Sequence, residues 1–500
     1  MENKLLNWKI PKNIKNQLDN FTNNGNVVVT RFPPEPSGYL HIGHIKALLI
    51  NTVLAKRFGG KLILRFDDTN PSTENIEYEQ SIQEDINNLE IYPYLITHTS
   101  DYFENLIQYA EYLIEHRLAY VDNTPQEQIK IEREEKINSV NRDKSPEANM
   151  NDWNNMKKGI NTDSILRMKI DMQHKNNVMR DPTIFRTKDL EHARTGNKFK
   201  VYPTYDFACP IVDYLEGVTH VYRSTEFGNR DEQYIHILNV FNLTPPYLGS
   251  YGKLEIQDFD LSKRKIKDLI SRNIIEGWDD PRLLTLRGAF RGGIHPNALF
   301  DYIEKIGFSK NKVNMTAEML QTTNKKYIDK CSTRYTALRS NNLLNIRTND
   351  TIEIKSKLIP KFVRSPNMGT REIIYTNNIF VDKSEYNECY TGEEITLINW
   401  GNIFVQDDNI FMLNLDGDFK STSKKILWLC NSDENANIKI KILKYNGMDN
   451  PPEISYYLGE PDMINIKRGE FVQLLRMEYY ICDKPYDDKS KYLTLIEINS

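Results

Sequence analysis

The chain has 500 residues, enough for about three or four domains by the usual domain size. Its 65 basic and 69 acidic residues leave a formal charge of −4, so bulk charge does not support indiscriminate nucleic-acid binding, and any RNA site must be a local patch. The five cysteines are far apart and odd in number, and no C-x-x-C pair occurs, so neither a disulfide framework nor a zinc site is indicated for Cys209, Cys331, Cys389, Cys430 and Cys482. No apolar run could span a bilayer, and the N-terminus lacks a signal-peptide core, so we expect a soluble, unprocessed, cytoplasmic protein without a membrane partner.

The first structured part of the chain has the pattern of a βαβ unit. Residues 1–25 are polar and read as a short arm, and residues 26–32 have the β-branched density of a buried strand. Apolar residues then recur at helical spacing over residues 42–58, Gly59 and Gly60 end this helix, and residues 61–66 form the next strand. Ligands of such units bind at the carboxyl ends of the strands.

The junction between the first strand and the helix, residues 30–44, has the sequence TRFPPEPSGYLHIGH. His41 and His44 share one face of the first helical turn, beside backbone N–H groups that attract anions. Gly43 leaves that face open to a flat ring. An isolated H-x-x-H would as readily be two surface histidines near a turn, but the Pro-Ser-Gly before it and the strand after it favour a nucleotide-binding loop.

The remaining elements follow in chain order. A helix is expected over residues 101–116, and a charged stretch poor in apolar residues covers 123–160. Residues 165–170 and 178–186 alternate like strands, and the αβ pattern restarts near residue 202. Helical periodicity follows within 268–338. Short strands at barrel-like spacing are then predicted at 402–405, 425–429, 438–442 and 492–498.

Two motifs connect these elements to a known family. Residues 36–44, PSGYLHIGH, resemble the HIGH signature of class I aminoacyl-tRNA synthetases in the form used by the glutamyl/glutaminyl branch. Residues 260–265, DLSKRK, are similar to the KMSKS loop of the same branch, although Asp260 stands where the generic motif has its first lysine. Only Lys263 is therefore carried over as the lysine that contacts phosphate. Alone, this segment would read as a solvated basic loop.

The resemblance implies a multidomain α/β plus β protein. It predicts a Rossmann-type catalytic domain with a HIGH motif and an acceptor-binding insertion, a helical stem-contact segment, and a C-terminal β-barrel region that binds the anticodon. The β-rich end is the form found in archaeal and eukaryotic cytoplasmic glutamyl enzymes and in glutaminyl enzymes, whereas bacterial glutamyl enzymes carry helical bundles there. The predicted segments are 1–25 (arm), 26–122 (catalytic, first half), 123–200 (acceptor-end insertion), 201–267 (catalytic, second half, with the KMSKS-like loop), 268–340 (stem contact) and 341–500 (anticodon barrel).

Amino-acid activation requires a carboxylate to attack the α-phosphorus of ATP, and its barrier is mostly positioning and developing charge on phosphate oxygens. The resemblance implies catalytic roles for His41, His44, Ser262 and Lys263. It implies ATP contacts from Gly38, His41, Gly43, His44 and Lys263. We expect Mg²⁺ to arrive with ATP, and predict no protein-held metal.

The amino acid is predicted from four further positions. By resemblance, Arg31 and Arg223 bind the side-chain carboxylate of glutamate, a bidentate task that suits guanidinium, and glutaminyl enzymes have a non-basic residue at the second position. Asp67 and Tyr205 match positions that hold the α-ammonium, although Asp67 and Asp68 could also be strand-end turn formers. Lys253 stands where relatives have an arginine, which leaves its role open.

The resulting hypothesis is a glutamate–tRNA ligase that forms glutamyl-adenylate and transfers glutamate to the 3′ end of tRNA-Glu. Its partners are L-glutamate, ATP and tRNA-Glu, contacted at the acceptor end and the anticodon, and we expect a monomer that needs tRNA before activation. The alternatives are a glutaminyl-tRNA synthetase, a HIGH-type nucleotidyltransferase acting on a small metabolite, and a catalytically inert tRNA-binding scaffold. Candidate anticodon residues are Arg364, Arg371, Tyr375 and Phe380, with strand-core packing as the expected role of the two aromatics.

Overall fold

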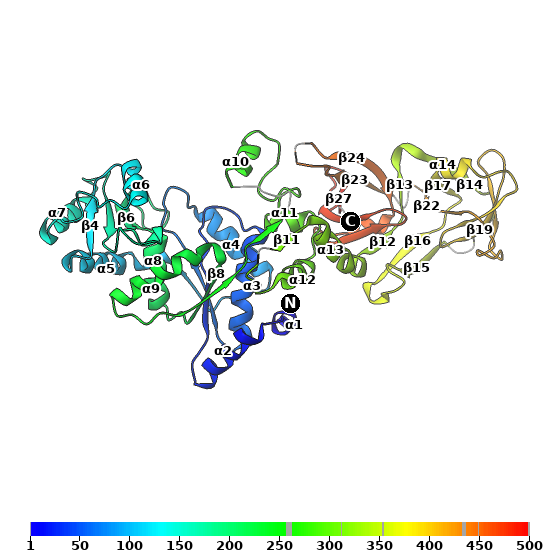
Figure 1. Ribbon diagram of the computed structural model, residues 1–500. Coiled ribbons are helices and arrows are strands. Elements are labelled where there is room, and N and C mark those ends of the chain that lie inside the picture. The colour runs from blue at the N-terminus through cyan, green and yellow to red at the C-terminus, as the bar shows by residue number, and fades with distance from the viewer. Residues whose placement is uncertain are drawn as a thin grey trace. The chain divides into compact units, whose positions relative to one another are not determined.

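The computed structural model describes residues 2–256, 263–311, 313–352, 355–432, 437–448 and 450–498 (Figure 1). The chain forms two compact units, one of Met1–Asp258 with Ile303–Met315 and one of Phe259–Tyr302 with Thr316–Ser500. Within the described ranges, no helix is long and apolar enough to cross a membrane. The finer six-segment division remains a prediction.

A parallel sheet forms the centre of the first unit. Strands β1 (Val29–Phe32), β2 (Lys61–Phe66) and β3 (Leu95–His98) pair in parallel, and α3 (Ile42–Arg57) connects the first two. This confirms the predicted βαβ unit. Each of the two positions after α3 requires glycine for a different reason. Gly59 has a φ of +60°, whereas a Cβ on Gly60 would lie 2.0 Å from the carbonyl oxygen of Val28.

A second parallel pair extends this sheet. Strands β8 (His220–Ser224) and β9 (Tyr247–Tyr251) pair in parallel, and Thr219 N donates to Val29 O at 3.0 Å, which places β8 beside β1. Helices α8 (Tyr205–Leu215) and α9 (Asp231–Val240) flank β8 in sequence. The carboxyl ends of β1, β2 and β8 therefore meet at one edge of the sheet, as predicted for a ligand site.

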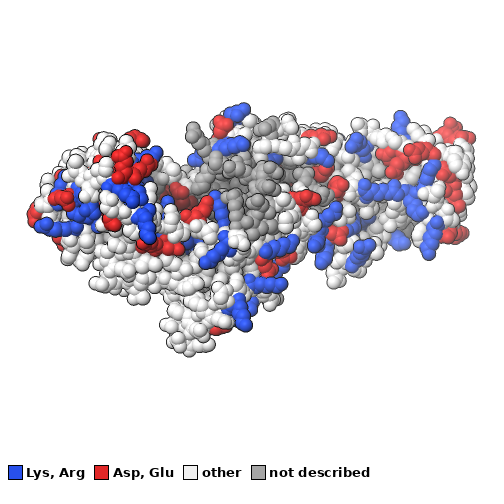
Figure 2. All heavy atoms as spheres, viewed as in Figure 1, with Lys and Arg blue, Asp and Glu red and all other residues white. Residues whose placement is uncertain are grey.

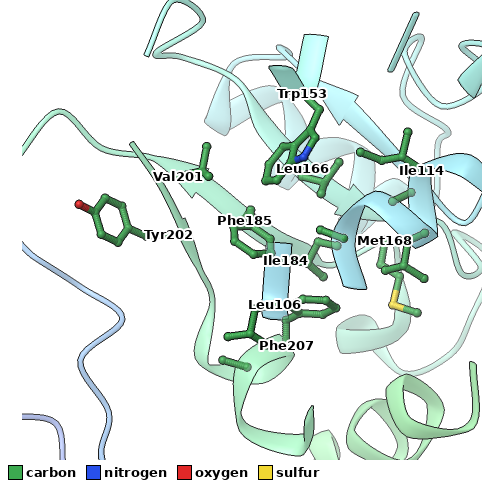
Figure 3. Close-up of a cluster of buried hydrophobic side chains, with 14 of the residues drawn as sticks. Leu106, Ile114, Trp153, Leu166, Met168, Ile184, Phe185, Val201, Tyr202 and Phe207 are labelled. Carbon is green, nitrogen blue, oxygen red and sulfur yellow. The ribbon is translucent and has the colours of Figure 1, made fainter. Parts of the chain in front are cut away.

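The segment between β3 and α8 forms a subdomain with its own antiparallel sheet, of order β4-β5-β6-β7. Its strands and helices are α5 (Phe103–Glu115), β4 (Ala119–Asp122), α6 (Gln126–Glu135), α7 (Pro146–Lys157), β5 (Ile165–Met168), β6 (Thr183–Thr187) and β7 (Val201–Pro203). The predicted strand over 178–186 begins only at Thr183, because Asp181 has a φ of +39°. Figure 3 shows the core, in which Trp153 and Phe185 lie with ring centroids 5.2 Å apart.

The N-terminal residues pack against the sheet of the first unit. Leu18 is fully buried and belongs to one core cluster with Ile50, Leu54 and Tyr222. The predicted arm thus contains two helices that contribute to the core. The remaining elements of this unit are α1 (Glu2–Asn7), α2 (Lys12–Asn23), α4 (Ile76–Asn88), β10 (Leu254–Ile256) and β11 (Val313–Met315).

The second unit begins with helices, as the sequence predicts for residues 268–338. These are α10 (Lys263–Ser271), α11 (Leu286–Arg291), α12 (Pro296–Ile306), which ends beyond the boundary between the units, and α13 (Ala317–Cys331). Within this unit Arg291 forms an ion pair with Asp483 at 2.8 Å, which joins α11 to the strands that follow.

A seven-stranded sheet of order β12-β25-β26-β27-β23-β24-β13 follows. Its two outer strands are separated in sequence only by Thr336, so the sheet nearly closes on itself as a barrel. This confirms the predicted β-barrel class. The strands are β12 (Thr333–Tyr335), β13 (Ala337–Arg339), β23 (Ile438–Lys444), β24 (Glu453–Gly459), β25 (Phe471–Leu474), β26 (Tyr479–Lys484) and β27 (Leu493–Glu497).

The residues between β13 and β23 form three smaller sheets, with an aromatic core of Tyr375, Trp400 and Trp428. Tyr375 is buried there, and Phe380 is half-buried against a neighbouring cluster, as expected for strand-core aromatics. Arg371 is buried and paired with Glu460. The elements are β14 (Leu343–Arg347), β15 (Ser356–Pro360), β16 (Thr370–Ile374), β17 (Asn378–Asp382), α14 (Lys383–Asn387), β18 (Glu394–Leu397), β19 (Gly401–Val405), β20 (Phe411–Asn414), β21 (Lys425–Ile426) and β22 (Trp428–Cys430).

Charge on the face drawn in Figure 2 does not single out an RNA-binding surface. On the face drawn in Figure 2, basic and acidic side chains are interspersed, in keeping with the nearly balanced composition. Arg364, a candidate anticodon residue, is exposed, whereas the ion pair of Arg371 makes that side chain unavailable to a base.

Phe185→Ala tests the core of the antiparallel subdomain. We expect a loss of about 3–5 kcal/mol in the free energy of unfolding, because the substitution removes a ring that is fully buried and leaves a cavity. Denaturant-induced unfolding, followed by fluorescence, measures this. Val140→Ala is the control, since Val140 is 92% exposed; an equal loss in both variants would contradict this account of the core.

Candidate functional site

The two histidines of the HIGH-like segment close the N-terminus of α3. His41 is the N-cap residue: its Nδ1 accepts a hydrogen bond from Gly43 N at 3.1 Å, while His44 Nδ1 accepts one from His41 N at 3.3 Å. The two rings stack with centroids 3.7 Å apart. This reciprocal cap fixes both imidazoles beside the helix end, where partial positive charge favours an anion.

Gly43 is required by this arrangement. A Cβ at this position would lie 2.9 Å from Cε1 of His41. The flat ring that lies over Gly43 is thus the ring of His41 itself, where the sequence led us to expect an open face. Gly38 is buried in the loop between β1 and α3.

The second predicted motif lies at the edge of what the structure describes. Lys263 is the first residue of α10, and Ser262 lies outside the described residues. Both belong to the second unit, whereas the histidines belong to the first. Their predicted roles therefore rest on the motif alone.

Arg31 lies on β1 and is almost completely buried, with 1% of its surface exposed. Its Nε donates to both carboxylate oxygens of Asp213, at 3.1 and 3.2 Å, and its Nη2 approaches Cys209 Sγ at 3.7 Å. Burial opposes the charge, but Asp213 raises the pKa of Arg31 above its usual range. The guanidinium is therefore charged and held by its Nε edge.

Arg223 is held in the same way by a different carboxylate. Its Nε and Nη2 donate to Asp231 Oδ1 at 3.1 and 2.5 Å. Burial acts to lower the pKa of Arg223, but the hydrogen bonds to Asp231 raise it overall. The guanidinium carbon lies 5.6 Å from the ring centroid of Phe227 and 5.1 Å from that of Tyr234, so the cation contacts aromatic rings.

Tyr205 is the common neighbour of the two arginines. It is the first residue of α8, and the positive charges of Arg31 and Arg223 both act to lower the pKa of its phenol. Burial nevertheless raises the pKa of Tyr205 well above its usual value, so the hydroxyl is neutral. The structure thus gathers the predicted residues Arg31, Tyr205 and Arg223 from β1, α8 and β8 into one cluster, called the pocket below, in which each guanidinium is paired with a carboxylate.

Asp67 and Asp68 follow β2 but have different environments. Asp68 is buried and accepts hydrogen bonds from Ser100 N at 2.8 Å and Ser100 Oγ at 2.5 Å, so it serves the fold. Asp67 is half-buried. Burial is the main cause that raises the pKa of Asp67 to about 7; the charge of Arg65 opposes this shift, and the negative charges of Asp68 and Glu35 add to it. A cationic ligand beside Asp67 would stabilise the ionised form of this carboxylate.

Several residues of the pocket were absent from the sequence-based set. Arg65 Nη2 donates to Asp213 Oδ1 at 2.7 Å, and Tyr234 Oη donates to Asp213 Oδ2 at 2.8 Å. Tyr205, Cys209 and Asp213 lie four residues apart on α8 and so share one face. That spacing is a signal by which Asp213 could have been found from the sequence.

Two further results concern Lys253 and metal binding. Lys253 forms an ion pair with Glu226 at 2.9 Å, and both side chains are about half exposed. Among the residues that the structure describes, no group of histidine, cysteine or carboxylate side chains could hold a metal ion.

The parallel sheet, the histidine-capped helix and the arginine pocket at the strand ends are the features of the class I aminoacyl-tRNA synthetase architecture. The family model described as "tRNA synthetases class I (E and Q), catalytic domain" matches residues 27–330, and the model of the corresponding "anti-codon binding domain" matches residues 332–416. The chain belongs to this E and Q family of class I tRNA synthetases.

Relatives in other organisms are similar over most of the chain. The bifunctional glutamate/proline–tRNA ligases of Mus musculus and Drosophila melanogaster are each 40% identical over 93% of this chain, which covers 33% and 29% of those proteins. The cytoplasmic glutamate–tRNA ligase of Arabidopsis thaliana is 37% identical over 94% of this chain and 69% of its own length. The chain thus spans about one third of the length of the bifunctional relatives it matches.

Gly43→Ala tests the cap at α3. We expect the added methyl group to displace the His41 ring and abolish its stacking on His44, because the methyl carbon would lie 2.9 Å from His41 Cε1. Spectra of protein labelled at histidine ¹³Cε1 report the two rings directly. Gly228→Ala is the control, since a Cβ there meets nothing within 4 Å; unchanged His41 and His44 resonances in Gly43→Ala would contradict the cap.

Proposed function

We propose that this protein is a glutamate–tRNA ligase, which uses ATP to activate L-glutamate and transfers it to the 3′ end of tRNA-Glu. The observation that carries the proposal is the pair of charged, buried arginines, Arg31 and Arg223, around Tyr205. Guanidinium groups suit a carboxylate in bidentate geometry, which is the group that distinguishes glutamate from glutamine. The names of the relatives agree with this choice.

The pocket suits both ends of glutamate. Arg31 and Arg223 would bind the side-chain carboxylate, while Asp67 and the Tyr205 hydroxyl would bind the α-ammonium. The α-carboxylate then remains to attack the α-phosphorus of ATP, so the protein needs neither a covalent nucleophile nor a base. His41 and His44, with Gly38 and Gly43 in the same loop, would contact the nucleotide beside the N-terminus of α3.

The remaining roles extend the family assignment. Lys263, with Ser262 before it, would stabilise the negative charge that develops on the phosphates, and Mg²⁺ would arrive with ATP. The C-terminal strands would contact the anticodon, since the anticodon-binding model matches residues 332–416. We propose a cytoplasmic location, which the names of relatives state for those proteins, and a monomer that needs tRNA before it activates glutamate.

The nearest alternative is a glutaminyl-tRNA synthetase. Binding glutamine would turn the N–H donors of an amide toward the guanidinium donors of Arg31 and Arg223 and would forfeit charge-assisted hydrogen bonds that a carboxylate accepts. A charging assay with purified tRNA and radiolabelled glutamate or glutamine decides between the two. We expect glutamate to be charged, with ATP–pyrophosphate exchange only when tRNA is present; preferential charging of glutamine would refute the proposal.

Lys263→Ala tests the role assigned to the second motif. If this lysine stabilises mainly the transition state, its loss should lower kcat about 100- to 1000-fold, or about 3–4 kcal/mol. Steady-state aminoacylation measures the effect. Arg272→Ala, which removes an exposed cation from the same region, should keep the parent rate; parent-like turnover by Lys263→Ala would remove the lysine from the mechanism.

The raised pKa of Asp67, about 7, predicts a pH dependence of glutamate binding. Only the ionised carboxylate attracts the α-ammonium, so KM for glutamate should rise by up to about tenfold per pH unit as the pH falls below 7. Above pH 8 the dependence on this group should vanish. Asp67→Asn should raise KM and remove the inflection, while Glu35→Gln should move it to lower pH, because the Glu35 charge favours the protonated form.

A further inference from the structure

Asp213 is the most strongly constrained carboxylate of the pocket. Its side chain is completely buried, and it accepts hydrogen bonds from Arg31, Arg65 and Tyr234 at distances of 2.7 to 3.2 Å. Burial opposes ionisation, yet Arg31 and Arg65 lower the pKa of Asp213 to about 2. The Asp213 carboxylate is therefore ionised at neutral pH.

The two arginines depend on Asp213 to different degrees. Arg31 and Arg65 lie on the same face of adjacent strands, since Arg31 pairs in register with Ile63, two residues before Arg65. Arg65 has a second carboxylate, because its Nη1 donates to Glu216 at 2.7 Å. Among the described residues, Asp213 is the only carboxylate that pairs with Arg31. Without this anion, two like charges would face each other with one of them uncompensated.

The other oxygen of Asp213 connects to the second arginine of the pocket. Tyr234 donates its hydroxyl to Asp213 Oδ2, and the ring of Tyr234 lies 5.1 Å from the guanidinium of Arg223. One carboxylate thus orients Arg31 directly and Arg223 through an aromatic ring. Its place on α8, two turns beyond Tyr205, puts it behind the residues that would touch the ligand.

We propose that Asp213 is a positioning residue for glutamate recognition. Asp213 holds the Nε edge of Arg31, whose Nη2 also contacts Cys209 Sγ, and so directs Nη1 to the ligand carboxylate. By holding Tyr234 it also fixes the ring against which the guanidinium of Arg223 packs. This inference rests on the proposed function, because it assigns Arg31 and Arg223 to the side chain of the amino acid. Asp213 itself contacts no substrate.

The test separates positioning from general stability. Asp213→Asn keeps the shape but removes the charge and turns an N–H group toward a guanidinium. We expect KM for glutamate to rise about tenfold or more, with KM for ATP unchanged within about twofold, in tRNA-dependent pyrophosphate exchange. Asp213→Glu, which keeps the charge, should recover part of the loss.

Glu216→Gln is the matched control. Glu216 is also a carboxylate with almost no exposure and also pairs with Arg65, but it makes no contact with Arg31 among the described residues. We expect this variant to lose stability while its KM for glutamate stays within about threefold of the parent value. Equal rises in KM for both variants, a rise in KM for ATP in Asp213→Asn, or parent-like constants in that variant would each overturn the inference.

Two further measurements keep the test decisive. If Asp213→Asn does not fold, Tyr234→Phe removes only the hydroxyl bonded to Asp213 and should raise KM for glutamate, but not for ATP, by about two- to fivefold. An unchanged KM for glutamate in this variant would then refute the inference. If the parent enzyme activates glutamine instead, the proposed function fails by itself, while the effect of Asp213 is still measured on KM for glutamine.

Discussion

The ion pair between Arg31 and Asp213 is the constraint on which the site in the first unit depends. Burying a guanidinium in the core of a parallel sheet costs several kcal/mol unless an anion lies beside it. The fold places that anion on α8, so the strand that carries Arg31 and the helix that carries Tyr205 must pack in one register. The local charge of the pocket is therefore set by a few buried contacts, while the net charge of the chain, −4, has no bearing on it.

The same principle explains why the pocket arginines are arranged before any ligand binds. Asp213 and Asp231 each hold the Nε side of one arginine, which limits rotation of the side chain and lowers the entropic cost of binding. Each arginine then presents a directed donor group to a ligand carboxylate. The histidine pair at α3 is ordered by comparable means, through reciprocal hydrogen bonds between side chain and backbone at the helix end. Both halves of the site are thus ordered by hydrogen bonds within the protein, local ones at the helix end and long-range ones at the arginines.

The sequence predicted the parts of this site that depend on neighbours along the chain. The βαβ unit and the histidines at the start of α3 follow from periodicity and from a cap completed within four residues. Arg31 and Arg223 came from the family resemblance, and Asp213 was missed because its partner is 182 residues away, although its spacing from Tyr205 on α8 was visible. Asp67 and Asp68 could not be distinguished by sequence, since only the tertiary contact with Ser100 assigns Asp68 to the fold. Likewise, the residues next to Arg371 in sequence did not indicate its ion pair with Glu460, which is distant along the chain.

The arginines and Asp67, which the proposed function assigns to opposite ends of the amino acid, respond differently to protons. The arginine end has a fixed charge, because Asp213 and Asp231 keep Arg31 and Arg223 protonated at any relevant pH. The aspartate end titrates, because the pKa of Asp67 is about 7. A bound ammonium group would favour the ionised form of Asp67, so the ligand itself completes the charge balance at that end. Under the proposed function, discrimination between a carboxylate and an amide would rest on the two arginines, whose charge does not change with pH, and the strength of binding would rest in part on Asp67.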